Sequence, residues 1–174
     1  MNRAVPILAS IALTLTASPG APADGAAPWA MSRHVQYFAV RLRPNVDLFA
    51  SLRGFAKEHG LRAAFVASCV GSATRACVRY ANQPSASTRE GHFEIVSLSG
   101  TLAQEGGHLH VAFADSTGAT FGGHLMEGTT IYTTAEIVLG ELSDVAFSRE
   151  PDSTYGYREL VPLPRAGKAR GAAR

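Results

Sequence analysis

The sequence has only two cysteines in 174 residues, Cys69 and Cys77. A disulfide framework needs several cysteine pairs, and a cysteine-based zinc site needs closely spaced pairs, so both classes are excluded. In an oxidising compartment the two thiols could still pair across a hairpin, because Gly71 and Ser72 between them would permit a tight turn. The alternative is two buried free thiols.

Charged residues are also few, at 17% of the chain, and they are unevenly placed. The formal net charge is +2, but six of the basic residues lie before His34 or after Pro164. Between those two positions acidic side chains outnumber basic ones by thirteen to ten. A phosphate backbone is bound by clustered Lys and Arg, so the body of the chain is a poor electrostatic match for nucleic acid.

No apolar run reaches the roughly 20 residues that a membrane-spanning helix needs, so no permanent membrane span is expected. Ala4–Ala17 is apolar for the most part, follows a basic start and precedes small residues at Ala21–Ala23. That order predicts a secretory signal peptide and a periplasmic or secreted protein. If translation starts at Met31 instead, the protein would be cytoplasmic. The expected signal peptide, linker, folded domain and basic flexible tail cover residues 1–23, 24–34, 35–163 and 164–174.

Hydrophobic patterning within the domain predicts one helix and many strands. Leu48, Leu52 and Phe55 recur at helical spacing after a capping Asn45 or Asp47, and Gly60 suits the helix end. Strands are expected over residues 36–43, 63–70, 76–80, 92–98, 108–114, 120–125, 130–139, 144–149 and 155–160. We expect the second and third of these to pair with each other, and residues 82–90 to form a loop. Short connections favour antiparallel pairing, so the predicted fold class is α+β, a single compact domain with a mostly antiparallel β-sheet packed against one main helix.

Three of the six histidines fall within 17 residues. His108 and His110 are two apart on an expected strand, so both rings project from the same face. A turn at Asp115–Gly118 would bring His124 opposite this pair. Glycines at 122 and 123 would let the backbone approach closely beside them. The spacing therefore predicts that three imidazoles converge.

A convergent set of His108, His110 and His124 would hold a divalent transition metal. Neutral imidazoles suit zinc, nickel, copper or iron, and zinc is the metal we expect. Three protein ligands leave a coordination position open for water or an unknown small ligand. The alternative is that the histidines form structural hydrogen bonds at an interface.

Glu94 and Glu136 each stand between apolar residues of an expected strand. An unpaired buried carboxylate is costly, so each needs a partner, for which Arg79 and Arg149 are structural candidates. Either glutamate could instead accept a hydrogen bond from a metal-ligating histidine. His92, close to Glu94, is expected on the sheet surface rather than as a fourth ligand.

Four segments together resemble the plants-and-prokaryotes-conserved (PPC) domain. They are GHFEIVSLSG at 91–100, HLH at 108–110, GGHL at 122–125 followed by Gly128, and TTAEI at 133–137. The resemblance runs from about Tyr37 to Leu160. The Gly-Arg-Phe-Glu-Ile-Leu core of the family corresponds to Gly91–Val96, with His92 in the arginine position.

The resemblance implies a compact fold with an antiparallel sheet, assembled as a homotrimer. Plant members carry AT-hooks in nuclear proteins, whereas bacterial members stand alone and are often labelled as DNA-binding proteins. This chain has no Arg-Gly-Arg-Pro hook, and its body is acidic. In bacterial members the His-x-His and Gly-Gly-His positions resemble a metal site, and His108, His110 and His124 match all three.

Three functions follow as hypotheses. The first is an exported, stand-alone, trimeric metal-binding protein whose ligand or reaction is undefined. The second is DNA binding, as the family label and the basic tail suggest. The third is a metal-dependent lyase or hydrolase with Glu94 or Glu136 as the base. The sequence has no phosphate-binding glycine loop, no Gly-x-Ser-x-Gly elbow and no reactive cysteine motif, so no nucleophile is identified and enzymatic activity stays open.

Overall fold

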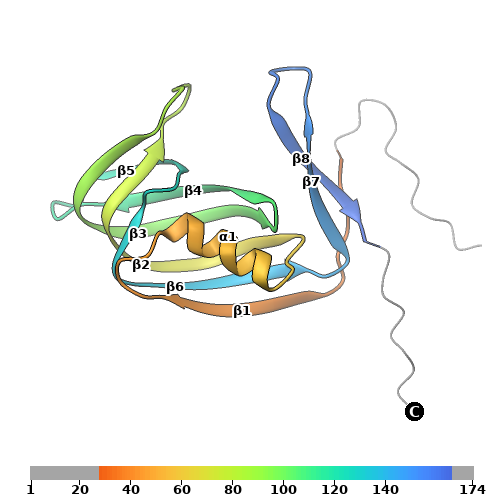
Figure 1. Cartoon of the computed structure of the whole chain (residues 1–174), viewed down its shortest axis with the longest axis horizontal. Coiled ribbons are helices and arrows are strands. Elements are labelled where there is room, and N and C mark those ends of the chain that lie inside the picture. The colour runs from red at the N-terminus through yellow and green to blue at the C-terminus, as the bar shows by residue number, and fades with distance from the viewer. Residues whose placement is uncertain (1–27, 166–174) are drawn as a thin grey trace, which may run out of the picture.

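The computed structural model describes residues 28–165. The expected signal peptide, the start of the linker and all but the first residues of the basic tail lie outside this range. Within it, no helix is both long and apolar enough to cross a membrane. The elements in chain order are β1 (Val35–Leu42), α1 (Leu48–Glu58), β2 (Ala64–Arg79), β3 (Ser87–Ala103), β4 (Gly106–Ala114), β5 (Thr120–Leu125), β6 (Thr130–Leu142), β7 (Val145–Pro151) and β8 (Arg158–Pro164) (Figure 1).

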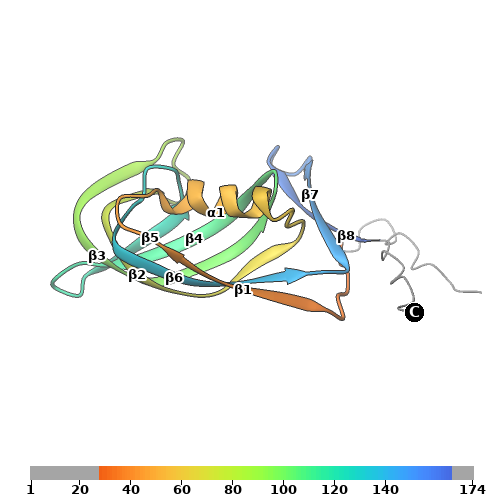
Figure 2. The ribbon, with the colours of Figure 1, turned by 60° about the horizontal axis from the view of Figure 1, so that its bottom comes forward.

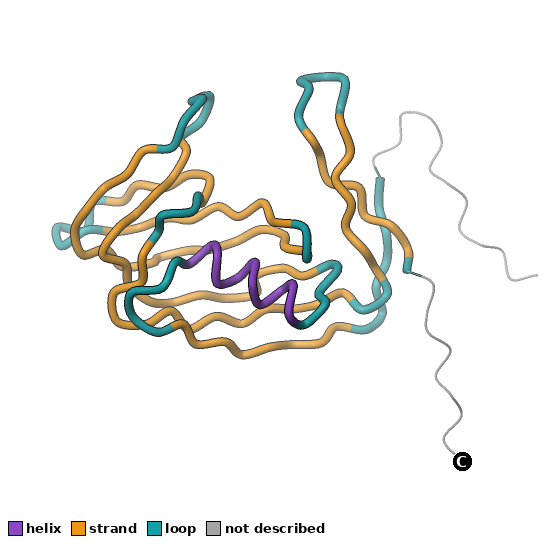
Figure 3. Tube along the Cα trace, in the orientation of Figure 1, coloured by secondary structure: helices purple, strands orange, loops and turns teal. Residues whose placement is uncertain are grey.

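Six strands form one antiparallel sheet in the order β1-β6-β2-β3-β4-β5. Strand β5 also pairs with the end of β2, through Val78 opposite Leu125 and Arg79 opposite His124, so strands β2 to β5 close on themselves at one end. Strands β7 and β8 form a separate hairpin, which rises beside the sheet in Figure 1. In the described residues α1 is the one helix (Figure 3). The predicted α+β class, an antiparallel sheet with one main helix, is confirmed.

Helix α1 has the ends that the sequence predicts. The Asp47 carboxylate accepts a hydrogen bond from the Ala50 backbone N–H at 2.7 Å, so Asp47 caps the first turn. At the other end Gly60 has a φ of +65°, which suits glycine. The buried side of the helix, Leu48, Leu52 and Ala56, packs on the sheet. Figure 2 shows α1 lying along one face, and the described residues place no helix on the opposite face.

The expected hairpin of residues 63–70 with 76–80 is wrong, because both segments belong to the single continuous strand β2. Gly71 is not a turn residue. It has a φ of +151°, and a Cβ at this position would collide with the Thr134 carbonyl of β6. The glycine therefore permits a close approach between β2 and β6, and the strand continues through it.

The two cysteines are both free and buried. They lie eight positions apart on the same strand, which at about 3.3 Å per residue separates them by roughly 25 Å. A disulfide between them would need a Cα separation below about 7 Å, so the pairing considered above is wrong. Burial also raises the pKa of the Cys69 thiol to about 11, and that group is protonated and unreactive at neutral pH.

The last residues of the expected linker are anchored to the domain. Backbone N–H groups of Arg33 and His34 donate to the Asp144 carboxylate at 2.8 and 3.2 Å. The hydrogen bond from Arg33 is the main reason that the pKa of Asp144 lies below its usual range. Asp144 precedes the β7–β8 hairpin, so the start of the chain and this hairpin are held together.

Candidate metal centre

The β4–β5 hairpin positions the histidines as their spacing predicts. Its turn is closed by Asp115, whose carboxylate accepts backbone hydrogen bonds from Thr117 at 2.8 Å and Ala119 at 3.1 Å. The resulting register puts His110 directly opposite His124. On β4, Leu109 and Val111 point into the core, so His108 and His110 project from the outer face.

The donor atoms of the three rings are close enough to share one ion. The Nε2 atoms of His108 and His110 are 3.1 Å apart, and ligand atoms of all three histidines lie within 4.8 Å of one another. In a tetrahedral site with metal–nitrogen bonds of about 2.0–2.1 Å, neighbouring nitrogens are ~3.3 Å apart. The His108–His110 separation matches such a site, and the three imidazoles together could hold one metal ion.

Two glycines allow β5 to occupy its place between β4 and β2. A Cβ at Gly123 would lie 2.7 Å from the Arg79 carbonyl oxygen of β2, and one at Gly122 would collide with the Val111 carbonyl of β4. The close backbone approach predicted for these glycines is therefore present. It brings the adjacent residue, His124, between His110 on one side and Arg79 on the other.

The surroundings favour neutral imidazoles. Burial, then the neighbouring charges of His108 and Arg79, lower the pKa of His124 to about 4. Burial is also the first cause that lowers the pKa of His108, followed by the charge of Arg149. Both rings are therefore unprotonated at neutral pH and available to bind a metal.

Two hollows adjoin the histidines. The larger, of about 660 Å³, is bounded by the ends of β2, β4 and β5 and by the β7–β8 hairpin. We call it the histidine groove; it is lined by Arg79, Asn82, Gln83, Pro84, Gly107, His108, His124, Arg149, Tyr157, Arg158 and Glu159. A smaller hollow of about 320 Å³ also reaches His108 and His110 and shares Arg149 and Glu159 with it.

Glu94 and Glu136 do not belong to this site. Both are exposed, so the assumption that they are buried and need partners is wrong. Glu94 lies opposite Ala114, whereas the residue opposite His110 is Ser99. Glu136 lies beside Arg41 and Val70, on strands β1 and β2. Neither carboxylate lines either hollow beside the histidines.

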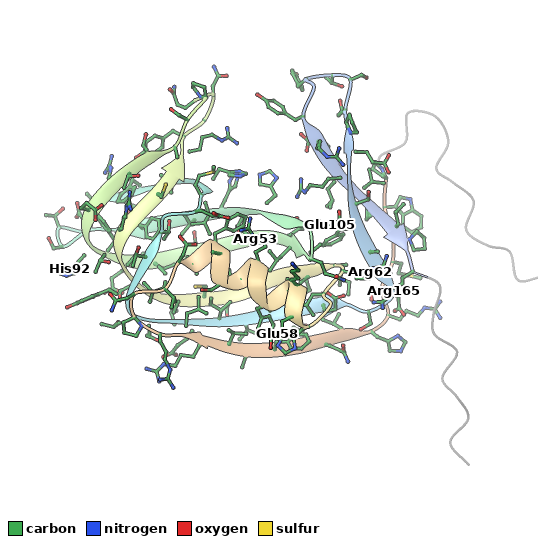
Figure 4. The ribbon with its side chains drawn as sticks, viewed as in Figure 1. Arg53, Glu58, Arg62, His92, Glu105 and Arg165 are labelled. Carbon is green, nitrogen blue, oxygen red and sulfur yellow. The ribbon has the colours of Figure 1, made fainter. Side chains whose placement is uncertain are left out.

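His92 is likewise separate from the cluster. Figure 4 labels it at the end of the sheet far from the β7–β8 hairpin. Its ring packs against Tyr132 with 4.4 Å between centroids. The prediction that His92 is a sheet-surface residue rather than a fourth ligand agrees with this position.

Sequence reasoning missed the cationic surroundings of the histidines. Arg79 and Arg149 were expected as partners for the glutamates, but both line the histidine groove, together with Arg158 of β8. The position of Arg79 beside the histidines depends on the pairing of β2 with β5, which sets Arg79 opposite His124. No local pattern marks Arg158, since the packing of the hairpin alone brings it to the groove.

Comparison with known proteins now identifies the family. Residues 31–143 match the family model described as the Plants and Prokaryotes Conserved (PCC) domain. The chain belongs to the PCC domain family. The resemblance noted from the four sequence segments is thereby confirmed, and all three histidines lie within the matched range.

Three similar proteins align with different fractions of this PCC-domain chain. A solved hypothetical protein from Salmonella cholerae-suis (Salmonella enterica) has a TM-score of 0.77 and 42% identity, covering 79% of this chain and 99% of its own. A solved metal-containing protein from Archaeoglobus fulgidus has a TM-score of 0.62 and 28% identity, covering 72% and 93%. The curated bifunctional protein GlmU of Synechococcus sp. (strain JA-3-3Ab) is 44% identical over 142 residues, which are 82% of this chain. The chain spans only 23% of the length of that curated relative.

Proposed function

We propose that this PCC-domain protein binds one divalent transition metal, zinc in the first instance, through His108, His110 and His124. The observation that carries the proposal is the convergence of three imidazole donors within 4.8 Å. Histidine nitrogens are among the preferred ligands of zinc. The relative from Archaeoglobus fulgidus, which is named a metal-containing protein, lends support from outside the chain.

Three protein ligands would leave a coordination position open, and two of them, His108 and His124, line the histidine groove. Such a position takes a small ligand or a water molecule. The lyase or hydrolase hypothesis loses the bases assigned to it, since Glu94 and Glu136 lie elsewhere on the sheet. We therefore propose a metal-dependent binding or sensing role. The composition of residues 1–23 supports the further proposal that the protein acts after export.

Metal analysis tests the histidine site. Protein stripped with a chelator, reloaded with zinc and freed of excess is expected to retain one zinc per chain. His110→Ala should weaken zinc binding by a factor of about 100 or more, because a ligand is lost outright. His92→Ala is the matched control, since His92 is an exposed histidine outside the cluster, and it should keep its zinc. Absence of stoichiometric zinc from the unmutated protein would contradict the proposal.

We further propose a homotrimer that uses the sheet face opposite α1. Large apolar side chains are exposed there, among them Val70, which is 61% exposed. Register places Val70 beside Glu136, and Glu136 beside Arg41. Apolar and charged groups thus alternate across neighbouring strands, a composition that suits contact with further copies of the chain.

Mass measurement tests the trimer. Light scattering during size exclusion should give three times the chain mass for the unmutated protein. Val70→Arg is expected to raise the dissociation constant of the assembly at least ~10-fold, because it buries an unpaired charge in the contact. Leu163→Arg, at an exposed position on β8, serves as the control and should leave the mass unchanged. A monomeric unmutated protein at micromolar concentration would exclude the trimer.

A further inference from the structure

Positive charge is concentrated in the histidine groove. Three arginines line it, Arg79, Arg149 and Arg158, against a single carboxylate, that of Glu159. These are three of only ten basic residues in the otherwise acidic segment from His34 to Pro164. Arg79 comes from β2, whereas Arg149 and Arg158 come from the β7–β8 hairpin about 70 residues later in the chain, so the fold gathers these cations around one space.

The guanidinium groups of this groove are not engaged with carboxylates. In the described part of the chain, the ion pairs involve Arg53, Arg75 and His34. Arg149 donates to the Thr101 hydroxyl at 3.3 Å, and Arg158 donates to the Arg149 backbone carbonyl. Arg79 donates to the Gln83 backbone carbonyl at 3.5 Å. A guanidinium has five N–H donors, so each of the three arginines keeps donors free for a ligand.

We propose that the histidine groove binds a small oxyanion with more than one negative charge. One oxygen would take the open position on the metal, and the others would accept hydrogen bonds from Arg79 and Arg158. Carboxylates and phosphates each present two oxygens that one guanidinium can bind through parallel hydrogen bonds, and the oxygens of both are hard metal ligands. This inference rests on the proposed metal site, because the metal supplies one of the positive charges.

Size and shape favour a small molecule. The groove volume of about 660 Å³ falls within the range of roughly 300–1,000 Å³ that holds small ligands. Its walls come from two sides, with His124 and Arg79 on the sheet and Tyr157 and Arg158 on the hairpin. An anion held between them would contact the sheet and the hairpin at once.

Calorimetric titration of zinc-loaded protein tests the proposal. Malonate probes a dicarboxylate, inorganic phosphate probes a phosphate group, and malonamide serves as the neutral counterpart of malonate. At least one of the two anions is expected to bind, and the amide is not. Arg79→Gln and Arg158→Gln should each weaken the anion about tenfold or more, since each removes a charge-assisted hydrogen bond. Comparison of the two anions identifies which oxygen chemistry the groove prefers.

Arg75→Gln is the matched control. Arg75 lies on the same strand as Arg79, but its guanidinium pairs with Glu90 at 3.2 Å and does not line the groove. Its replacement removes the same charge and should leave anion affinity unchanged. Cobalt-loaded protein provides a second readout, because entry of an anion oxygen at the open position changes the visible absorption of the metal.

Zinc content is measured first on every variant, which separates the two proposals. No zinc in the unmutated protein contradicts the proposed function. Full zinc with no anion binding, or with anion binding that is equal in the Arg79, Arg158 and Arg75 variants, overturns the oxyanion site alone. Binding of a DNA duplex in preference to both anions at physiological salt would also overturn it, because the groove would then recognise a polymer backbone.

Discussion

Lowering the pH from 7 to 5 is expected to weaken zinc binding by no more than about 10³-fold, whereas three histidines of ordinary pKa would lose about 10⁴-fold. The difference comes from proton competition. A histidine with a pKa near 6.5 loses about 25-fold of its neutral population over this interval, and three such ligands multiply their losses. His124, with a pKa lowered to about 4, stays largely neutral at pH 5. Protonation of His124 therefore contributes little to the loss of zinc affinity.

The sign of this effect can be checked on the metal-free protein. Because the pKa of His124 is lower in the folded than in the unfolded state, unfolding takes up a proton as the pH falls from about 6.5 toward 4. The free energy of unfolding of the metal-free protein should decrease over that interval. Urea denaturation at each pH measures the free energy of unfolding, and competition with a chromophoric chelator measures the zinc affinity. NMR titration of the imidazole signals measures the pKa of His124 directly. A 10⁴-fold loss of zinc affinity would show that His124 titrates ordinarily.

Local patterns predicted the elements that depend on short-range interactions. The cap at Asp47 and the glycine at Gly60 delimit α1 because both act within one helical turn. The turn at Asp115 sets the register of β4 and β5, and with it the meeting of His110 and His124. The core of the metal site could be predicted for this reason, since its ligands sit on one hairpin.

Contacts between segments distant in sequence determine several features that the sequence pattern leaves open. A glycine such as Gly71 suits either a turn or a strand position where a neighbouring strand approaches closely. The contact with Thr134 of β6 determines that the second arrangement occurs. Glu94 illustrates a different difficulty. Strand alternation sends Phe93 and Ile95 inward and Glu94 outward, so apolar neighbours in sequence do not imply that the glutamate is buried. The arginines of the histidine groove could not be predicted, because three separate elements supply them.

Replacing Phe113 with alanine is expected to lower the free energy of unfolding by about 3–5 kcal/mol, the usual cost of removing a buried phenylalanine. The Phe113 side chain is fully buried and packs against both Phe93 and Phe121, with ring centroids 6.2 and 5.6 Å away. Urea denaturation measures the loss. Tyr155→Ala removes an aromatic ring that is 83% exposed and should change stability by less than about 0.5 kcal/mol.

The same variant connects the core with the proposed metal site. Phe113 is three residues from His110 on β4, but its ring points into the core while the imidazole points outward, so the metal ligands themselves are unchanged. Zinc that binds only the folded state stabilises it by about 4.1 kcal/mol at a concentration 1,000 times the dissociation constant. Zinc should therefore restore most of the stability lost in Phe113→Ala. In the double variant Phe113→Ala/His110→Ala zinc should restore little, because the added metal can stabilise the fold only through the intact histidine set. Equal recovery in both variants would show that zinc acts elsewhere on the chain.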